Sequence, residues 1–149
     1  VVVTGALHQE LLPELEGLPL MVERNPHWAD GMGSGISLGF HKLINLEPEI
    51  QNVIIAVCDQ PFVTSDFLSN LLSLKNKSKK TIVSSAYAGT YGTPVLFDRT
   101  HFQALLNLKG TEGAKRLIKQ LKEDMFSTPF EKGKLDIDTE ADYIKLIND

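Results

Sequence analysis

Short apolar runs rich in β-branched residues alternate along the chain with longer segments whose apolar residues recur at helical spacing. In the segment 35–47, for example, Ile36, Phe40 and Leu43 fall on one broad helical face. This alternation predicts an α/β fold with a mostly parallel sheet flanked by helices. The expected strands cover 1–4, 19–25, 52–61, 80–87, 89–99 (after a turn), 125–130 and 134–138, and the expected helices cover 8–17, 35–47, 65–76, 100–110, 111–124 and 139–149.

Several predicted helices begin at residues that favour helix N-termini. The expected N-caps are Ser34, either Thr64 or Ser65, and Thr139, since a Ser or Thr hydroxyl accepts a hydrogen bond from an N–H of the first turn. Asp142 lies in the first turn after Thr139, where a negative charge suits the helix dipole. Pro13 is expected to interrupt or start the first helix.

The run 52–61 is apolar without alternation, which is typical of a strand buried on both faces of a parallel sheet. Cys58 lies in this run, so we expect it to be a small buried hydrophobe rather than a nucleophile. Because it is the single cysteine of the chain, no intrachain disulfide can form.

The composition narrows the class of protein. The length of 149 residues fits one domain over 1–149, and the 42% hydrophobic and 23% charged residues are ordinary for a globular chain. A net charge of −4 without a long basic run argues against a nucleic-acid partner. The sequence has no apolar run of about 18 residues, so we expect no membrane span. A cytoplasmic location is the resulting prediction.

The loop "NPHWADGMGSGIS", residues 25–37, follows a predicted strand and precedes a predicted helix. Ligands of parallel sheets bind beyond the carboxyl ends of the strands. Gly31 and Gly33 permit close backbone approach to a ligand, and a helix start near Ser34 suits a phosphate. Trp28 and Met32 fit contacts with a nucleotide base. The same residues fit a tight turn with an N-cap and a buried Trp, so both interpretations stay open.

Two carboxylates follow predicted strands far apart in the sequence. Asp59 stands at the tip of the strand 52–61, where it can ligate Mg²⁺, and the alternative for it is a helix or turn cap. Asp136 and Asp138 alternate in the predicted strand 134–138, so one of them faces the ligand side, and Asp138 lies nearer the strand end. Two carboxylates on one metal suit phosphoryl transfer. The alternative for Asp138 is helix capping.

The stretch "YAGTYGTPVLF", residues 87–97, combines two glycines and a proline with two tyrosines. It fits a lid-like turn that lines a pocket for a flat ring. It equally fits a hairpin with exposed tyrosines.

Six motifs in order make the chain resemble the molybdenum cofactor cytidylyltransferases and their guanylyltransferase relatives, within the Rossmann-like nucleotidyltransferase fold. The motifs are "VVVTGA", "NPHWADGMGSGI", "CDQPFV", "YAGTYGTPVLF", "LKGTEGAKRLI" and "LDIDTEAD". The resemblance implies transfer of CMP from CTP, with GTP as the other candidate, to the phosphate of the molybdopterin cofactor, and release of pyrophosphate.

The resemblance also implies roles for particular residues. Asp59 and Asp138 would be the catalytic carboxylates and the Mg²⁺ ligands. The nucleotide-binding residues would be Asn25, Trp28, Gly31, Met32, Gly33 and Ser34, and the substrate-binding residues would be Gln60, Tyr91, Gly92, Thr93 and Pro94. Molybdoenzymes would be possible partners.

One departure from the resemblance concerns the start of the chain. The family begins with a strand and a Gly-rich loop carrying an Arg and a Lys, and this unit is absent before Val1. We therefore expect an N-terminally truncated chain with little activity alone, and a sheet gap that dimerisation or strand swapping would fill. Transfer to another acceptor such as a sugar phosphate, and a non-catalytic pterin- or nucleotide-binding role, stay open as alternatives.

Overall fold

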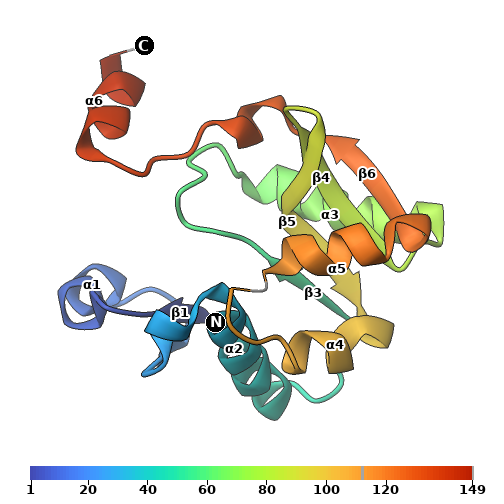
Figure 1. The fold of residues 1–149 in the computed structure, drawn as a ribbon, viewed down its shortest axis with the longest axis horizontal. Helices are drawn as coiled ribbons and strands as arrows, with labels where there is room; N and C mark the ends of the chain where they lie inside the picture. Colours follow the sequence, from blue (N-terminus) through green and yellow to red (C-terminus); the bar gives the residue numbers. More distant parts are fainter. Residues whose placement is uncertain (112, 149) are drawn as a thin grey trace. The chain divides into compact units, whose positions relative to one another are not determined.

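A computed structural model describes residues 1–111 and 113–148 (Figure 1). The chain divides into two compact units, each built from two stretches of sequence. Unit 1 comprises Val1–Asn52 and Asp98–Leu117, and unit 2 comprises Val53–Phe97 and Ile118–Asp149. No helix among the described residues is both long enough and apolar enough to cross a membrane.

Unit 1 is built around two short parallel strands. β1 (Val2–Thr4) pairs with β2 (Val22–Arg24) in the register Val2 to Val22. The connection between them carries a helix, as a parallel pair requires. The helices of this unit are α1 (His8–Leu15), η1 (Trp28–Asp30), α2 (Met32–Leu46), η2 (Arg99–His101) and α4 (Phe102–Leu106).

Helix α2 packs closely on its neighbours because small residues line its contact face. A Cβ atom on Gly39 would lie 2.5 Å from a methyl carbon of Val3, so only glycine permits this approach of α2 to β1. On the side of α4, the rings of Phe40 and Phe102 meet edge to face with centroids 4.7 Å apart. The Ser37 hydroxyl donates to a backbone carbonyl of α4.

Unit 2 contains a four-stranded sheet in the order β3-β5-β4-β6. β4 runs antiparallel to β5 and parallel to β6, and α3 packs against β4 and β6 (Figure 1). The strands are β3 (Asn52–Ile55), β4 (Ile82–Tyr87), β5 (Thr90–Asp98) and β6 (Met125–Pro129), and the helices are α3 (Ser65–Ser78), η3 (Lys122–Asp124), η4 (Glu131–Lys134) and α6 (Glu140–Asn148). Helix α5 (Ala114–Gln120) crosses the boundary between the units.

The core of unit 2 lies between α3 and the sheet. Leu71, Val83 and Leu96 are fully buried there. Partly buried apolar side chains pack around them, namely Ile54, Phe67, Leu68 and Leu74. Burial of this apolar surface holds the strands that carry the site residues described below.

The predicted α/β class is confirmed. The two-stranded sheet is parallel, and the four-stranded sheet is mixed because the β4–β5 hairpin is antiparallel. Two predicted N-caps are also confirmed. The Thr64 hydroxyl accepts from the N–H of Phe67, and the Thr139 hydroxyl accepts from the N–H of Asp142. Two residues of the predicted helices, Glu112 and Asp149, lie outside the described residues.

Three expectations about the first half of the chain are wrong. Gly31, not Ser34, is the N-cap of α2, because the helix already begins at Met32. Pro13 lies inside α1 rather than at its start or at an interruption. Cys58 is exposed rather than buried, because β3 ends at Ile55 and the chain leaves the sheet before reaching it.

Two predicted strands also differ from the structure. Residues 53–55 are half-buried rather than buried on both faces, because β3 is the edge strand of its sheet. Residues 134–138 form no strand. η4 ends at Lys134, and an irregular segment leads from there to α6. The argument that Asp136 and Asp138 alternate across a strand therefore fails.

Candidate functional site

A backbone hydrogen bond within unit 2 joins the two predicted metal-ligand segments. Asp59 lies in a turn four residues after β3, and its carbonyl accepts from the N–H of Ile137 at 2.9 Å. Asp138 directly follows Ile137, so its Cα lies about 3.8 Å from that of Ile137. The structure thus brings together two aspartates that are 79 residues apart in the sequence (138 − 59).

The carboxyl group of Asp59 contains an unpaired oxygen. Its Oδ1 atom is buried and has no hydrogen-bond partner among the described residues. Buried polar atoms are nearly always paired, and an unpaired charged oxygen is costly. A bound cation would satisfy this atom. The arrangement fits a divalent metal ion that Asp59 holds directly.

The side chain of Asp138 is exposed, so its carboxylate is free to serve as a second ligand of a metal ion. The described residues contain no group of three or more His, Cys, Asp or Glu side chains able to hold a metal. Mg²⁺ commonly uses one or two carboxylates and takes its other ligands from water and substrate phosphates. Two aspartates therefore suffice for this type of site.

Gln60 lies directly beside Asp59, and its side chain is only 5% exposed. Its amide nitrogen donates to the carbonyl of Gly133 at 2.8 Å and to the hydroxyl of Tyr87 at 3.3 Å. Its amide oxygen accepts from the hydroxyl of Thr93 at 3.2 Å. Both ends of the amide are thus occupied by the protein itself.

The predicted substrate-binding residues 91–94 belong to β5, on the second strand of the β4–β5 hairpin. The stretch thus forms a hairpin, but the expectation of exposed tyrosines is wrong, because Tyr87 and Tyr91 are both half-buried. Lys122 lies over the ring of Tyr91, 5.8 Å from its centroid. Gly92 is buried against Tyr87, and Pro94 is fully buried after a cis peptide bond. Tyr91 and Thr93 keep partly exposed side chains.

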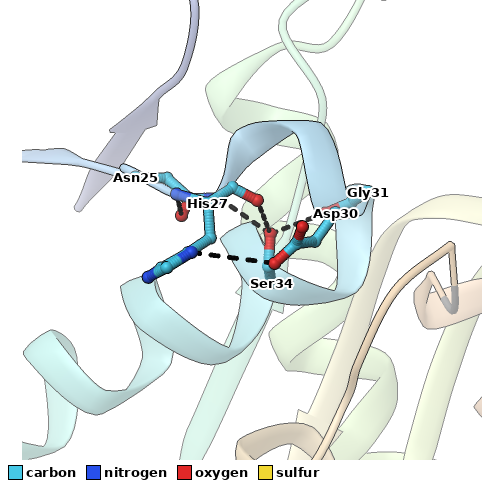
Figure 2. Close-up of polar contacts among 5 residues, drawn as sticks. All are labelled: Asn25, His27, Asp30, Gly31 and Ser34. Atoms are coloured by element: carbon cyan, nitrogen blue, oxygen red, sulfur yellow. Dashed lines mark hydrogen bonds and ion pairs between the residues drawn. The ribbon is translucent and has the colours of Figure 1, made fainter.

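The predicted nucleotide loop in unit 1 is held by a hydrogen-bond network around Ser34 (Figure 2). Asn25 is 5% exposed, and its amide nitrogen donates to the Ser34 hydroxyl at 2.9 Å while its amide oxygen accepts from the N–H of His27. The Ser34 hydroxyl lies 2.8 Å from the carbonyl of Gly31 and 2.9 Å from that of His27. Asn25 and Ser34 therefore shape the loop from within.

The glycines of this loop permit contact with another part of unit 1. Gly31 has φ of 111° and ψ of 178°, a backbone region that is essentially restricted to glycine. A Cβ atom there would lie 2.5 Å from the carbonyl oxygen of Gly110, and the N–H of Gly33 donates to that same carbonyl at 2.9 Å. The close approach is thus to the segment around Gly110.

Trp28 and Met32 are the large apolar side chains that the loop presents to solvent, with exposed fractions of 53% and 59%. The alternative of a buried Trp is therefore wrong. Exposed aromatic and thioether side chains beside a helix start provide an apolar surface on which a base can stack.

Sequence reasoning missed Gly133 and Ile137, which fix the position of the Asp138 segment. Both act through backbone groups, so residue type gives little signal. For Gly133 a signal exists, since a Cβ there would lie 2.4 Å from the ring of Phe130 and 2.7 Å from that of Tyr87. A glycine in the sequence can mark such a close approach, because it has no Cβ.

Residues 1–125 match the family described as MobA-like NTP transferase domain. The chain belongs to this family. It is 33% identical over 116 residues to the purine catabolism protein PucB of Bacillus subtilis strain 168. The aligned residues cover 76% of this chain and 54% of PucB. The chain therefore spans about half the length of this curated relative.

Solved structures share the fold. The manganese complex of Rv0371c from Mycobacterium tuberculosis H37Rv aligns over 99% of this chain and 76% of its own, with a TM-score of 0.73 and 22% identity. Molybdopterin-guanine dinucleotide biosynthesis protein A from Archaeoglobus fulgidus aligns over 96% and 75%, with a TM-score of 0.64 and 14% identity. At these identities the likeness establishes the α/β fold.

Proposed function

We propose that the protein is a divalent-metal-dependent nucleotidyltransferase that transfers CMP from CTP to the phosphate of a molybdopterin-type acceptor. The observation that carries the proposal is the buried, unpaired Oδ1 of Asp59 beside the segment of Asp138. Membership of the NTP transferase family and the six motifs that resemble cytidylyltransferases support it.

In the proposed reaction an oxygen of the acceptor phosphate forms a bond to the α-phosphorus of CTP. The bond from that phosphorus to its bridging oxygen breaks, and pyrophosphate leaves with the electron pair. A divalent cation, when bound, would neutralise charge on the transferring group. Asp59 and Asp138 would hold it, with Mg²⁺ as the expected ion. Manganese in the mycobacterial structure supports a divalent cation for this fold.

The remaining residues would bind or position the two substrates. Trp28 and Met32 would contact the base through their exposed side chains. Gly31, Gly33 and Ser34 would act through the shape of the loop, because the N–H groups of all three already donate to carbonyls of unit 1. Asn25 would act through the loop that it holds together. In unit 2 the partly exposed Tyr91 and Thr93 would face the acceptor, while the buried Gly92 and Pro94 would shape that strand.

The acceptor and nucleotide are tested by measuring pyrophosphate release from CTP, GTP, ATP and UTP, each with molybdopterin cofactor or with a sugar phosphate. We expect release with CTP and the molybdopterin cofactor. Release only with a sugar phosphate would favour the other transferase function. Nucleotide-dependent thermal stabilisation without any release would favour a binding protein.

The role of Asp59 is tested in the same assay with Asp59→Asn. We expect pyrophosphate release to fall by roughly 100-fold or more, as for loss of an electrostatic contribution to a transferring group. Asp66→Asn is the matched control, because Asp66 is an exposed aspartate in the first turn of α3. Unchanged release by Asp59→Asn would refute the assignment of this residue.

A further inference from the structure

The side chain of Gln60 connects three segments of unit 2. It bonds Tyr87 at the end of β4, Thr93 in β5 and Gly133 in η4, while its own backbone continues from Asp59. Three bonds to a side chain that is 5% exposed leave little capacity for a substrate. In this respect Gln60 differs from the substrate-binding candidates Tyr91 and Thr93, whose side chains are partly exposed.

The chemistry of the partners fixes the orientation of this amide. The carbonyl of Gly133 can only accept, so the NH₂ group of Gln60 must face it. The amide oxygen then faces Thr93, whose hydroxyl donates to it. A side chain of the same size without an amide cannot reproduce both contacts.

Gln60 and Asp59 together bind the segment that leads to Asp138 at two points. The Gln60 side chain holds Gly133, and the carbonyl of Asp59 holds Ile137. The second contact lies one residue before Asp138. The first is reinforced by packing, because a Cβ on Gly133 would overlap the rings of Phe130 and Tyr87. Two anchors four residues apart fix both the place and the direction of the segment (137 − 133).

We propose that Gln60 is a positioning residue that holds the segments of Asp59 and Asp138 at the spacing a divalent cation needs, rather than a residue that binds substrate. The proposal rests on the proposed metal role of these two aspartates. Outer residues that orient metal ligands typically contribute about 10- to 100-fold to metal affinity. Loss of the Gln60 amide therefore weakens metal binding without removing a ligand.

The test is the dissociation constant of Mn²⁺, added alone to the full chain and measured by isothermal titration calorimetry. Gln60→Met preserves length and removes the hydrogen bonds, and we expect it to raise the dissociation constant about tenfold. Val83→Ala is the matched control, because it truncates a fully buried core residue of the same unit that makes none of the Gln60 hydrogen bonds. We expect Val83→Ala to lower the melting temperature and to leave the dissociation constant within about twofold of the original chain.

A second variant keeps the proposal testable where Gln60→Met fails to fold. Gln60→Leu also lacks the donor to Gly133 and the acceptor for Thr93 and adds no charge beside Asp59, so we expect the same weakening of Mn²⁺ binding. Equal weakening by Val83→Ala would show that general destabilisation is the cause and would overturn the positioning role.

The same titration separates failure of this inference from failure of the proposed function. Binding that Asp59→Asn abolishes and that both Gln60 variants leave unchanged would overturn the role of Gln60 and leave the metal site standing. Absence of Mn²⁺ binding by the original chain would overturn both.

Discussion

The carbonyl of Asp59 accepts a hydrogen bond of 2.9 Å from the N–H of Ile137, the residue before Asp138. This single backbone contact brings the segment of Asp138 next to that of Asp59, although the two aspartates are far apart in the sequence. The Gln60 amide adds a second contact to the same segment. The candidate metal site therefore depends on backbone groups as much as on the acidic side chains.

Replacing Gly31 by alanine should destabilise unit 1. Its φ of 111° lies in a region restricted to glycine, and a Cβ would lie 2.5 Å from a backbone carbonyl oxygen. We expect the free energy of unfolding in urea to fall by about 3 kcal/mol, at the upper end of the cost of such strain. Gly17→Ala is the control, since Gly17 has φ of 77° with nothing within 4 Å of the added Cβ, and about 1 kcal/mol is expected there. Equal losses would contradict the role of the close contact.

The network of Asn25 and Ser34 should behave as one unit. Ser34→Ala removes the acceptor of a buried amide, so we expect a loss of about 1–3 kcal/mol in the free energy of unfolding. With Asn25→Ala already present, the further loss from Ser34→Ala should be smaller, with a coupling of about 1 kcal/mol. Ser37→Ala is the control, because that hydroxyl bonds Leu106 instead, so its effect should simply add to that of Asn25→Ala.

The hydrogen bonds at the N-terminus of α6 should be lost at acidic pH. The carboxylate of Asp142 accepts from the hydroxyl and the N–H of Thr139, and these bonds hold its pKa below the ordinary value of 3.8. A lowered pKa means that the contribution to stability is complete above the unfolded pKa and is lost as pH falls through the folded value. We expect the amide proton of Thr139 to shift upfield in NMR spectra over that window.

Asp142→Asn should abolish this pH-dependent shift, because the asparagine amide does not ionise. Glu140→Gln is the control, since Glu140 lies in the same first turn and is not the acceptor for Thr139. A shift that persists in Asp142→Asn and disappears in Glu140→Gln would contradict the prediction, because it would show that Glu140 and not Asp142 causes the shift.

The sequence was sufficient for features that depend on local chemistry. The caps at Thr64 and Thr139 follow from short-range donors and acceptors, and the α/β class follows from periodic apolar residues. The predicted strand 80–87 is also found, as β4 over Ile82–Tyr87.

Features that depend on tertiary contacts could not be predicted from the sequence. Ser34 is an N-cap residue by type, yet α2 begins three residues earlier than predicted, where Gly31 and Gly33 contact Gly110. Cys58 continues an apolar run, yet β3 ends before it and leaves it exposed.

Of the candidate metal site, the sequence offers only the acidic residues as candidates, and their role as metal ligands stays a prediction. Asp59 stands out because it is a charge at the end of an apolar run, and this pattern is local. The positioning contacts of Gln60 with Gly133 and of Asp59 with Ile137 join residues more than 70 positions apart. They involve backbone groups, which every residue type possesses, so no pattern of residue types identifies them.

The most direct measurement of the central proposal is the location of Mn²⁺ by paramagnetic broadening of backbone amide signals in NMR spectra of the full chain. We expect broadening to be strongest for the amides near Asp59 and Asp138, and we expect Asp59→Asn to abolish it while Asp66→Asn leaves it unchanged. Broadening centred on other residues, or broadening near Asp138 that persists in Asp59→Asn, would contradict a metal site shared by these two aspartates.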